Sequence, residues 1–412
     1  MIPPGYKQTE VGVIPEEWEV ADLGEVTTQI GDGLHGTPVY SPLGSYFFIN
    51  GNNLSNGRIV ITNETQCVDR SEFKIHKKPL GDSSILMSIN GTIGNLALFN
   101  DEPVMLGKSV AFLNVSPRVS KSFIYHSLQA SNVTQQFFGG LTGSTIGNLG
   151  LATIRCTKIP LPQTEAEQRA IATALSDVDA LLAALDRLIA KQRDLKQAAM
   201  QQLLTGQTRL PGFMGTWETK RLGDCLLSRP DYGINAAAVP YSDRLPSYIR
   251  ITDISEHGRY CPDPQVSVNS VNSDQYYLRE GDVVFARTGA SVGKSYLYEP
   301  HDGELVFAGF LIRVRPNPDL LVSAFLAAYT TTKPYWSWVR LMSMRSGQPG
   351  INGNEYAQLP LLLPPLPEQT TIATILSDMD LELAALEQRR DKTRALKQGM
   401  MQELLTGRTR LV

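Results

Sequence analysis

The chain contains a segment that occurs twice and decides the fold. Its ends read EQRAIATALSD (167–177) and LLTGQTRL (203–210), and they return 201 residues later as EQTTIATILSD (368–378) and LLTGRTRL (404–411). From Gln168 to Leu210, 26 of 43 positions are identical in the second copy, without a gap. A repeat of this length and fidelity indicates an internal duplication.

Each copy is predicted to form one long helix. Thr164 followed by Glu167 has the pattern of a capping box, and Pro367 suits the first turn of the second helix. Gly206 and Gly407 are typical of the residue just past a helix C-terminus. About forty residues at about 1.5 Å each give a helix of roughly 60 Å, too long to bury its apolar face in a small domain. We therefore expect the two helices to pack on each other as a coiled coil, rather than to serve as ordinary core helices of separate domains.

A heptad pattern of apolar residues marks the expected contacts of this coiled coil. Gln192 and Thr393 occupy one polar position of the pattern, which can fix the register, and Glu382 and Arg389 interrupt the second copy. The interruption predicts looser pairing or a partner contact there. The apolar positions are Ile171, Ala174, Val178, Leu181, Leu185, Leu188, Leu195 and Ala199 in the first copy, and Ile372, Ile375, Met379, Leu386, Leu396 and Met400 in the second.

The composition is that of a soluble protein with more than one domain: 412 residues, 42% hydrophobic and 19% charged. The sequence offers neither an apolar run of membrane-spanning length nor a signal-peptide core, and its four cysteines are far apart, so we expect a reducing, cytoplasmic location and no structural zinc. The net charge of −3 argues against DNA binding through bulk electrostatics alone. It leaves open binding through local basic loops, especially if partners supply phosphate contacts.

Weaker echoes of the duplication continue outside the helices, where Trp18 matches Trp217 and Gly81-Asp82 matches Gly281-Asp282. Short apolar runs bounded by Gly, Pro, Asn and Asp predict strand-rich α/β (α+β) domains, each with one helix over its sheet, around 121–138 and 320–331. The predicted organisation is a pseudo-two-fold internal repeat. It consists of a first domain at 1–160, a central helix at 161–210, a second domain at 211–363 and a C-terminal helix at 364–412.

Two glycine motifs suggest nucleotide binding but lack its requirements. Residues 31–36 match G-x-G-x-x-G, yet Thr37-Pro38 follows where the pyrophosphate needs a helix N-terminus. Residues 287–295 resemble a Walker A loop, but Thr288 replaces the first glycine and the spacing is one residue short. The five histidines are scattered, and neither H-E-x-x-H nor G-x-S-x-G occurs, so we predict no catalytic and no metal-binding residues. By elimination, the chain binds rather than reacts.

Polar side chains beside glycines in loops can read base edges, with Arg or Lys suited to guanine and Asn or Gln to adenine. We therefore take the loop residues of this kind as candidate DNA-binding residues, although a single residue of this kind is more often a solvated loop residue. They are Asn90, Asn95 and Lys108 in the first domain, and Arg287, Lys294, Arg345, Gln348 and Asn352 in the second.

Several stretches resemble the specificity subunits of type I restriction-modification systems. The stretch YKQTEVGVIPEEW (6–18) resembles their N-terminal signature, and the Glu-Gln and Thr-Gly-x-Thr-Arg-Leu ends of both helices resemble their two conserved helices. The segment 31–40 resembles part of their target recognition domains, and on this basis His35 and Thr37 join the candidate DNA-binding residues. The resemblance covers essentially the whole chain.

The resemblance implies a non-catalytic subunit. Two target recognition domains would each read one half of a bipartite, asymmetric site in double-stranded DNA, and an antiparallel coiled coil would set their distance. Two modification subunits, which carry S-adenosylmethionine and methylate adenine, would dock on the repeated helices, and ATP- and Mg-dependent restriction subunits would join. No cofactor would lie in this chain.

Three other interpretations stay open at this point. A coiled-coil adaptor that binds proteins rather than DNA would tolerate neutralising Arg287, Lys294 and Arg345. An NTPase built on residues 289–295 would lose nucleotide binding on Lys294→Ala. A specificity chain of a related, fused restriction system would differ only in its neighbours.

Overall fold

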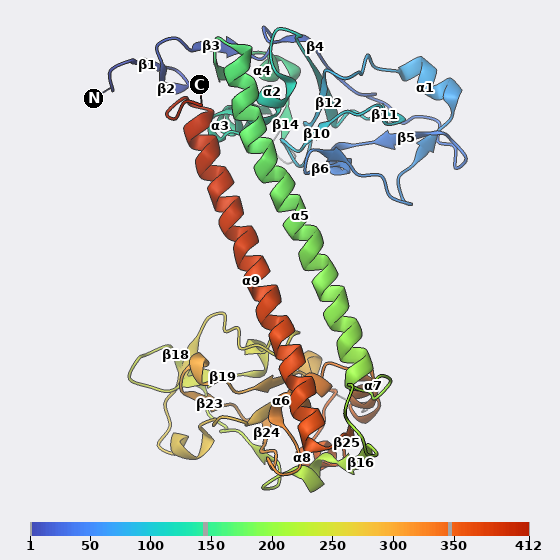
Figure 1. Cartoon of the computed structure of the whole chain (residues 1–412), viewed down its shortest axis with the longest axis vertical. Coiled ribbons are helices and arrows are strands. Elements are labelled where there is room, and N and C mark those ends of the chain that lie inside the picture. Colours follow the sequence, from blue (N-terminus) through green and yellow to red (C-terminus); the bar gives the residue numbers. More distant parts are fainter. Residues whose placement is uncertain (1, 143–146, 345–347, 412) are drawn as a thin grey trace. The chain divides into compact units, whose positions relative to one another are not determined.

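The computed structural model describes residues 2–142, 147–344 and 348–411, and its contacts divide the chain into two compact units (Figure 1). The first unit comprises Met1–Asp186 together with Gln388–Val412, and the second comprises Arg187–Glu387. Each repeated helix therefore contributes one end to each unit. The predicted boundaries between domains and helices, at residues 160, 210 and 363, remain a prediction.

The repeated segments form single long helices, as predicted. They are α5 (Glu165–Leu203) and α9 (Leu366–Leu404), each of 39 residues. The Thr164 hydroxyl accepts a hydrogen bond from the Glu167 N–H at 3.2 Å, so Thr164 caps α5, and Pro367 lies in the first turn of α9. None of the helices in the described part of the chain is both long and apolar enough to cross a membrane.

Gly206 and Gly407 lie just past the two helices with φ angles of +68° and +70°. This left-handed conformation disfavours any side chain, which confirms the predicted helix stops. Space adds a second constraint at Gly407, because a Cβ there would lie 2.5 Å from Cδ of Pro15.

The first unit is built on two sheets, one four-stranded and antiparallel (β10-β9-β12-β4) and one three-stranded (β11-β5-β8), in which β11 and β5 are parallel. Short pairs β1-β2, β3-β15, β6-β7 and β13-β14 complete it. The strands are β1 (Tyr6–Thr9), β2 (Gly12–Pro15), β3 (Glu19–Asp22), β4 (Thr27–Asp32), β5 (Tyr46–Ile49), β6 (Leu54–Ser55), β7 (Arg58–Ile59), β8 (Cys67–Val68), β9 (Ser84–Ser88), β10 (Leu96–Leu98), β11 (Val104–Leu106), β12 (Val110–Val115), β13 (Leu141–Thr142), β14 (Asn148–Leu149) and β15 (Lys158–Leu161). The helices are α1 (Arg70–His76), α2 (Lys121–Ser127), α3 (Ser131–Gly139), α4 (Leu151–Arg155) and the 3-10 turn η1 (Gly51–Asn53).

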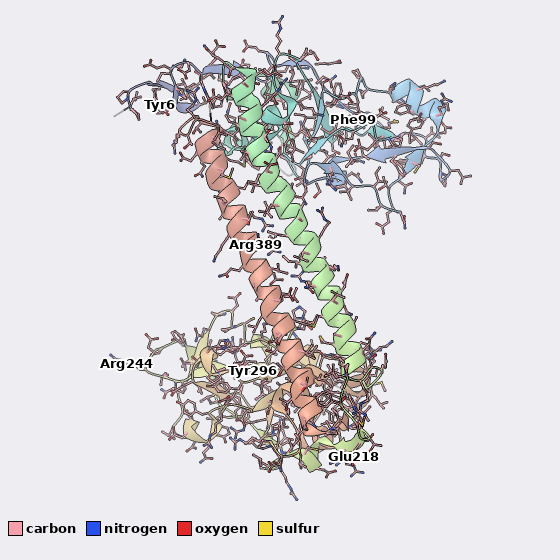
Figure 2. All side chains as sticks on the ribbon, viewed as in Figure 1. Tyr6, Phe99, Glu218, Arg244, Tyr296 and Arg389 are labelled. Atoms are coloured by element: carbon pink, nitrogen blue, oxygen red, sulfur yellow. The ribbon has the colours of Figure 1, made fainter. Side chains whose placement is uncertain are left out.

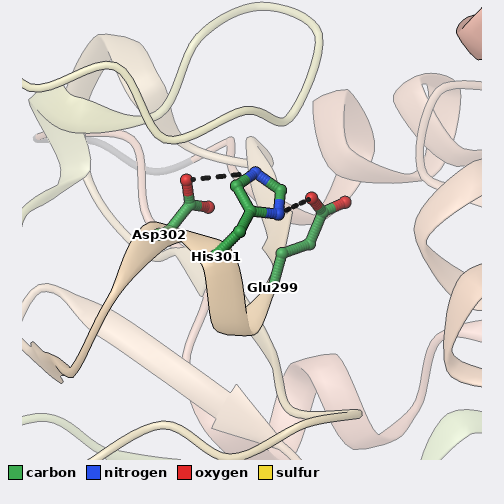
Figure 3. Close-up of side chains that lie close together, drawn as sticks. All are labelled: Glu299, His301 and Asp302. Atoms are coloured by element: carbon green, nitrogen blue, oxygen red, sulfur yellow. Dashed lines mark ion pairs between the residues drawn. The ribbon is translucent and has the colours of Figure 1, made fainter.

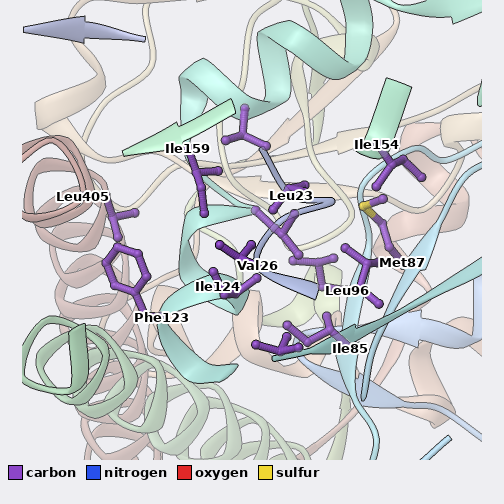
Figure 4. Close-up of a cluster of buried hydrophobic side chains, with 14 of the residues drawn as sticks. Leu23, Val26, Ile85, Met87, Leu96, Phe123, Ile124, Ile154, Ile159 and Leu405 are labelled. Carbon is purple, nitrogen blue, oxygen red and sulfur yellow. The ribbon is translucent and has the colours of Figure 1, made fainter. Parts of the chain in front are cut away.

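Strand β9 is buried on both faces, which explains the apolar run Ile85-Leu86-Met87 at its centre. Ile85 and Met87 point into a core shared with helix α2, with the start of α5 and with Leu405 beyond the end of α9 (Figure 4). Leu86 points to the opposite side, into a separate core that includes Phe112. The four-stranded sheet thus lies between two apolar layers.

The second unit repeats this plan. Its antiparallel sheet has the order β22-β21-β24-β17, a second sheet has the order β18-β20-β19-β23, and β16 pairs with β25. The strands are β16 (Glu218–Arg221), β17 (Asp231–Tyr232), β18 (Ala238–Pro240), β19 (Ser247–Ile249), β20 (Val266–Val268), β21 (Val283–Ala286), β22 (Ser295–Leu297), β23 (Leu305–Phe307), β24 (Leu311–Val314) and β25 (Pro360–Leu363). The helices are α6 (Ser323–Tyr329), α7 (Lys333–Met342) and α8 (Gly353–Ala357), with 3-10 turns η2 (Leu222–Cys225), η3 (Ile251–Asp253), η4 (Ser273–Tyr276), η5 (Gly289–Ser291) and η6 (Pro300–Asp302).

The prediction of one helix per domain was wrong. Residues 121–138 hold two helices, α2 and α3, because the chain turns at residues 128–130 between them. In the second unit, α7 follows α6 and was missed. Thr332 caps α7 by accepting from the Tyr335 N–H, and Pro334 lies in the first turn, so a Thr-x-Pro start signal was present in the sequence.

Ion pairs show that the segments of α5 and α9 run antiparallel within each unit. In the first unit, Lys397 lies 2.7 Å from Asp179 and Arg390 lies 3.9 Å from Asp186. The order of the pairs reverses between the two helices, as antiparallel packing requires.

The second unit shows the same reversal. Lys196 lies 2.5 Å from Asp380, and Arg193 pairs with Glu387. Gln192 donates to Glu382 at 2.8 Å, so the glutamate that interrupts the apolar pattern has a partner on the other helix.

The heptad assignment was wrong at several positions. Leu181, Leu188, Leu195 and Leu396 are at least 40% exposed, whereas Leu175 and Ile189, which the pattern left out, are buried. Charged pairs line part of the contact between the helix segments. The buried apolar residues lie near the helix ends and, in α5, also at Leu185 and Ile189. Arg389 is exposed (labelled in Figure 2).

A buried glutamate at the start of α5 joins three parts of the first unit. Glu167 is 2% exposed and accepts from Trp18 Nε1 at 3.3 Å and from Arg410 Nη2 at 2.9 Å. Arg410 follows the end of α9, and its guanidinium also pairs with Glu17. The end of one repeated helix therefore fixes the start of the other.

The second unit contains the same arrangement from the other copy of each residue. Glu368, at the start of α9, is fully buried and accepts from Trp217 Nε1 at 3.3 Å. Arg209, which follows α5, donates to it through Nε at 3.2 Å and Nη2 at 2.6 Å. We call each set the Trp-Glu-Arg cluster of its unit.

The glutamine that follows each buried glutamate ties the helix start to the rest of its unit. Gln168 donates to the Pro162 carbonyl at 2.9 Å and accepts from the Ser120 N–H at 2.9 Å. Gln369 does the same with Pro364 and Val322, again at 2.9 Å. The repeated Glu-Gln pair is thus explained by contacts within the chain.

Replacing Glu167 by Gln should destabilise the first unit by roughly 2–3 kcal/mol, because the partly buried Arg410 loses the buried one of its two carboxylate partners and keeps only the exposed Glu17. Amide hydrogen exchange of α2 and the start of α5, followed by mass spectrometry, measures this. The matched control is Glu165→Gln, which removes an exposed pair with Arg169 and should cost under about 0.5 kcal/mol. Equal exchange in the two variants would contradict the role of the cluster.

His126, on α2, is a buried titratable group in the first unit. It is 1% exposed, and its Nε2 lies 2.9 Å from the Ser176 hydroxyl. Burial, together with the nearby charge of Lys397, lowers the pKa of His126 to about 4, outweighing the attraction of Asp179. In the unfolded chain, His126 should therefore become protonated near pH 6.5, whereas in the folded chain it stays neutral at that pH.

The first unit should consequently lose stability as the pH falls from 6.5 towards 4, with His126 accounting for about 2 kcal/mol at pH 5. His126→Gln removes this contribution. Thermal unfolding at pH 7 and pH 5 should show a smaller loss for the variant than for the wild type, since all other acid-sensitive groups are shared. The same loss in both proteins would count against the buried, neutral histidine.

Candidate nucleic-acid interface

Two glycine-rich loops that are distant in the sequence meet in the second unit. Thr288 and Gly350 form an isolated β-bridge, and the Gly289 N–H donates to the Pro349 carbonyl at 3.0 Å. The Ile351 N–H donates to the Arg287 carbonyl at 2.9 Å. The structure thus brings the predicted residues Arg287, Gln348 and Asn352 together, while Arg345 lies outside the described residues.

Arg287 lies against an aromatic ring. Its guanidinium carbon is 4.9 Å from the ring centroid of Tyr232, and the Tyr232 hydroxyl accepts from the Gly353 N–H at 2.9 Å. The Arg287 N–H donates to the carbonyl of Phe310, an aromatic residue that is 59% exposed. Gln348 is exposed beside Gly289, 3.1 Å from where a Cβ on that glycine would be.

Two of the predicted residues have partners that explain them structurally. Lys294 lies 2.7 Å from Glu256, which neutralises its charge, and its side chain is 18% exposed. Asn352 caps α8, accepting from the Glu355 N–H at 2.9 Å while its own N–H donates to the Glu355 carboxylate at 2.7 Å. Both residues support the loops rather than extend from them.

The first unit brings its glycine loops together in the same way. Asn90 and Asn148 form an isolated bridge, and the Asn90 amide donates to the carbonyl of exposed Lys108 at 3.4 Å. Asn95 is half-buried, and its backbone pairs with Ser88 on the inner side of the loop. Asn90 and Lys108 therefore lie together, whereas the backbone of Asn95 is held by Ser88.

His35 and Thr37 are both exposed. His35 Nε2 lies 2.6 Å from the Asp32 carboxylate, and the neighbouring Leu34 bridges to Gly107, next to Lys108. The adjacent Gly33 permits this close approach, because a Cβ there would lie 2.3 Å from the Leu106 and Gly107 carbonyl oxygens. Gly33 therefore serves the close contact of two backbone segments.

The Walker-like loop shows the same departure from a phosphate site. Gly289–Ser291 form a 3-10 turn, and strand β22 follows instead of a helix. A helix N-terminus to hold phosphate is therefore missing at this loop. This agrees with rejecting the motif from its spacing.

The two units place their loop clusters at equivalent positions with unlike residues. Ile234 bridges to Ala308 as Leu34 bridges to Gly107, and Gly233 has the same close backbone contacts as Gly33. Tyr232 therefore corresponds to Asp32. Tyr232 and Phe310 were not predicted, although Tyr232 precedes a Gly-Ile-Asn stretch that echoes Gly33-Leu34-His35.

One group of metal-capable side chains occurs among the described residues of the second unit. His301 lies between two carboxylates, with Nδ1 3.2 Å from Glu299 and Nε2 3.5 Å from Asp302 (Figure 3). The Tyr296 hydroxyl donates to Asp302 at 2.6 Å. These contacts brace the 3-10 turn η6, and Glu299 and His301 are exposed.

The comparisons with known proteins agree with this architecture. The family model for the type I restriction modification DNA specificity domain matches residues 15–192 and again residues 214–394. A putative type I restriction enzyme MjaX specificity subunit of Methanocaldococcus jannaschii is 24% identical, over 98% of this chain and 97% of the relative. The type I restriction enzyme EcoKI specificity subunit of Escherichia coli is 22% identical, over 88% of this chain and 82% of the relative.

Solved structures share the fold. The S subunit of a type I restriction-modification system from M. genitalium matches with a TM-score of 0.59 and 17% identity, over 94% of this chain and 96% of that one. A chain from a structure concerned with complex assembly of the type I R-M system matches with a TM-score of 0.57 and 18% identity, over 96% and 99%. With two matches to its family model, the chain belongs to the type I restriction modification DNA specificity domain family.

Asn352→Ala should lower the stability of the second unit by about 1 kcal/mol, because the cap of α8 is lost. Asn352→Asp should retain it, since aspartate caps a helix equally well. Urea unfolding of the full chain, followed by exchange of the α8 amides, measures both. Gln348→Ala is the matched control and should leave stability unchanged; an equal loss there would show that the loop itself, not the cap, is being perturbed.

Proposed function

We propose that the chain is the DNA sequence-specificity subunit of a type I restriction-modification complex, in which each unit reads one half of a bipartite, asymmetric site. The family membership supports this, and so do relatives named as type I specificity subunits. One structural observation carries the proposal: equivalent loop clusters occur once in each unit, on the same backbone scaffold, with unlike side chains. Such a pair suits two unlike half-sites.

We further propose that α5 and α9 form one antiparallel coiled coil whose halves are related by a pseudo-two-fold axis. The reversed ion pairs within each unit and the repeated sequence support it. Two related domains that face one side of a duplex would be centred roughly one helical turn apart, about 34–36 Å. The coiled coil would then set the spacing of the half-sites.

The repeated helices also suggest the partners. Two similar surfaces can dock two copies of a modification subunit, although the half-sites differ. Those subunits would carry S-adenosylmethionine and methylate adenine flipped from the duplex, and restriction subunits would use ATP and Mg. The present chain would hold none of these catalytic sites and would act in the cytoplasm. The comparisons give no support to the alternative of a protein-binding adaptor.

The decisive experiment is sequencing for N6-methyladenine in DNA from cells that express the chain with its neighbouring modification subunit, and from cells that express either alone. A bipartite methylated motif should appear only when both are present. A stable complex of the two proteins without any motif would contradict the specificity role.

The independence of the two reading units can be tested by exchange. Replacing residues 18–161 with the corresponding segment of a relative should change one half of the motif and leave the other half and the spacing intact. The same sequencing measures this. A change in both halves would show that the units do not read DNA independently.

A further inference from the structure

The second unit holds an arginine whose charge is left unpaired. Arg313, Arg315 and Arg250 in the same unit each pair with an aspartate. Arg287, by contrast, makes no side-chain hydrogen bond or ion pair with any residue in the described ranges, and its Nε is buried without a partner. Its two terminal nitrogens are the donors that remain accessible.

The surroundings hold this arginine in one orientation. Its guanidinium packs over the Tyr232 ring at 4.9 Å, and the Tyr232 hydroxyl is fixed by the Gly353 N–H. The Arg287 backbone bonds to Phe310 on one side and Ile351 on the other. A guanidinium stacked on an aromatic ring keeps its hydrogen-bonding edge free while losing rotational freedom before binding.

We propose that Arg287, positioned by Tyr232, reads a guanine in the half-site of the second unit. The inference rests on the proposed function. Two parallel donors at the end of an arginine match O6 and N7 of guanine in the major groove. The exposed rings of Tyr232 and Phe310, 42% and 59% accessible, offer apolar surface for neighbouring bases, which a contact to phosphate alone would not use.

Lys294 is a weaker candidate for base recognition than Arg287. Its ammonium group pairs with Glu256 at 2.7 Å and donates to the Ile254 carbonyl at 3.4 Å. The first unit lacks the arrangement altogether, because Ile89, which is 3% exposed, stands at the position of Arg287, and Asp32 stands at that of Tyr232. DNA binding should therefore depend on a guanine contacted in this way only in the half-site of the second unit.

The test uses the chain assembled with its modification subunits and duplexes that carry the motif found by sequencing. Each guanine of the second unit's half-site is replaced in turn by 7-deazaguanine, which lacks the N7 acceptor. The variants are Arg287→Lys, which keeps the charge but not the paired donors, and Tyr232→Leu, which removes the ring. The matched control is Arg244→Lys, because Arg244 is an exposed arginine of the same unit that lies outside the two loops that meet at Thr288 and Gly350.

Arg287→Lys should weaken binding to the natural motif by roughly ten- to a hundredfold, while Arg244→Lys changes little. One 7-deazaguanine should weaken the wild type similarly and should have no additional effect on Arg287→Lys. Tyr232→Leu should show a smaller loss of the same kind. Complex formation with the modification subunits checks that each variant folds.

Three outcomes would overturn the assignment. The half-site could contain no guanine, Arg287→Lys could weaken all sequences equally, as a phosphate contact would, or the variant could remain fully sensitive to 7-deazaguanine. A wild-type complex without any bipartite motif would overturn the proposed function and this assignment together. A normal wild-type motif that Arg287→Lys leaves unchanged would overturn the assignment only.

Discussion

The structure depends on two buried glutamates, Glu167 and Glu368, each at the start of a long helix. A carboxylate with almost no solvent contact is costly unless it is paired. The pairing groups come from elsewhere in the chain: a tryptophan directly before β3 in the first unit and before β16 in the second, and an arginine beyond the end of the other helix. Neither unit is complete without both repeated segments. This requirement explains why Glu-Gln and Thr-Gly-x-Thr-Arg are among the parts that the two copies share.

The sequence predicted the features that rest on local signals. Caps, terminal glycines and the length of the two helices follow from Thr164, Pro367, Gly206 and Gly407, and the family resemblance followed from the same ends. The contacts along the helices could not be predicted from a heptad pattern. Leu181 is exposed and Leu175 is buried because sheets and charged partners, rather than an apolar seam alone, decide which face is covered.

The candidate site shows the same limit. Loop composition identified Arg287 and Gln348, but it also selected Asn352, which caps a helix, and Lys294, which a glutamate neutralises. Tyr232 was not predicted because the sequence alone does not show that it lies beside Arg287. Only the pairing of strands and the bridge at Ile234 bring them together.

The glycines explain how two units of one origin can acquire different specificities. Gly91 and Gly289 have φ angles of +73° and +71°, and Gly94 and Gly293 have +86° and +90°, so both loops follow the same backbone path. A shared backbone path determines the positions of the side chains but not their identity. An asparagine and lysine in one unit and a stacked arginine in the other then present different donors from one scaffold. Because the buried Trp-Glu-Arg clusters lie on separate elements from these loops, the candidate loop residues can differ between the units without weakening the framework that holds them.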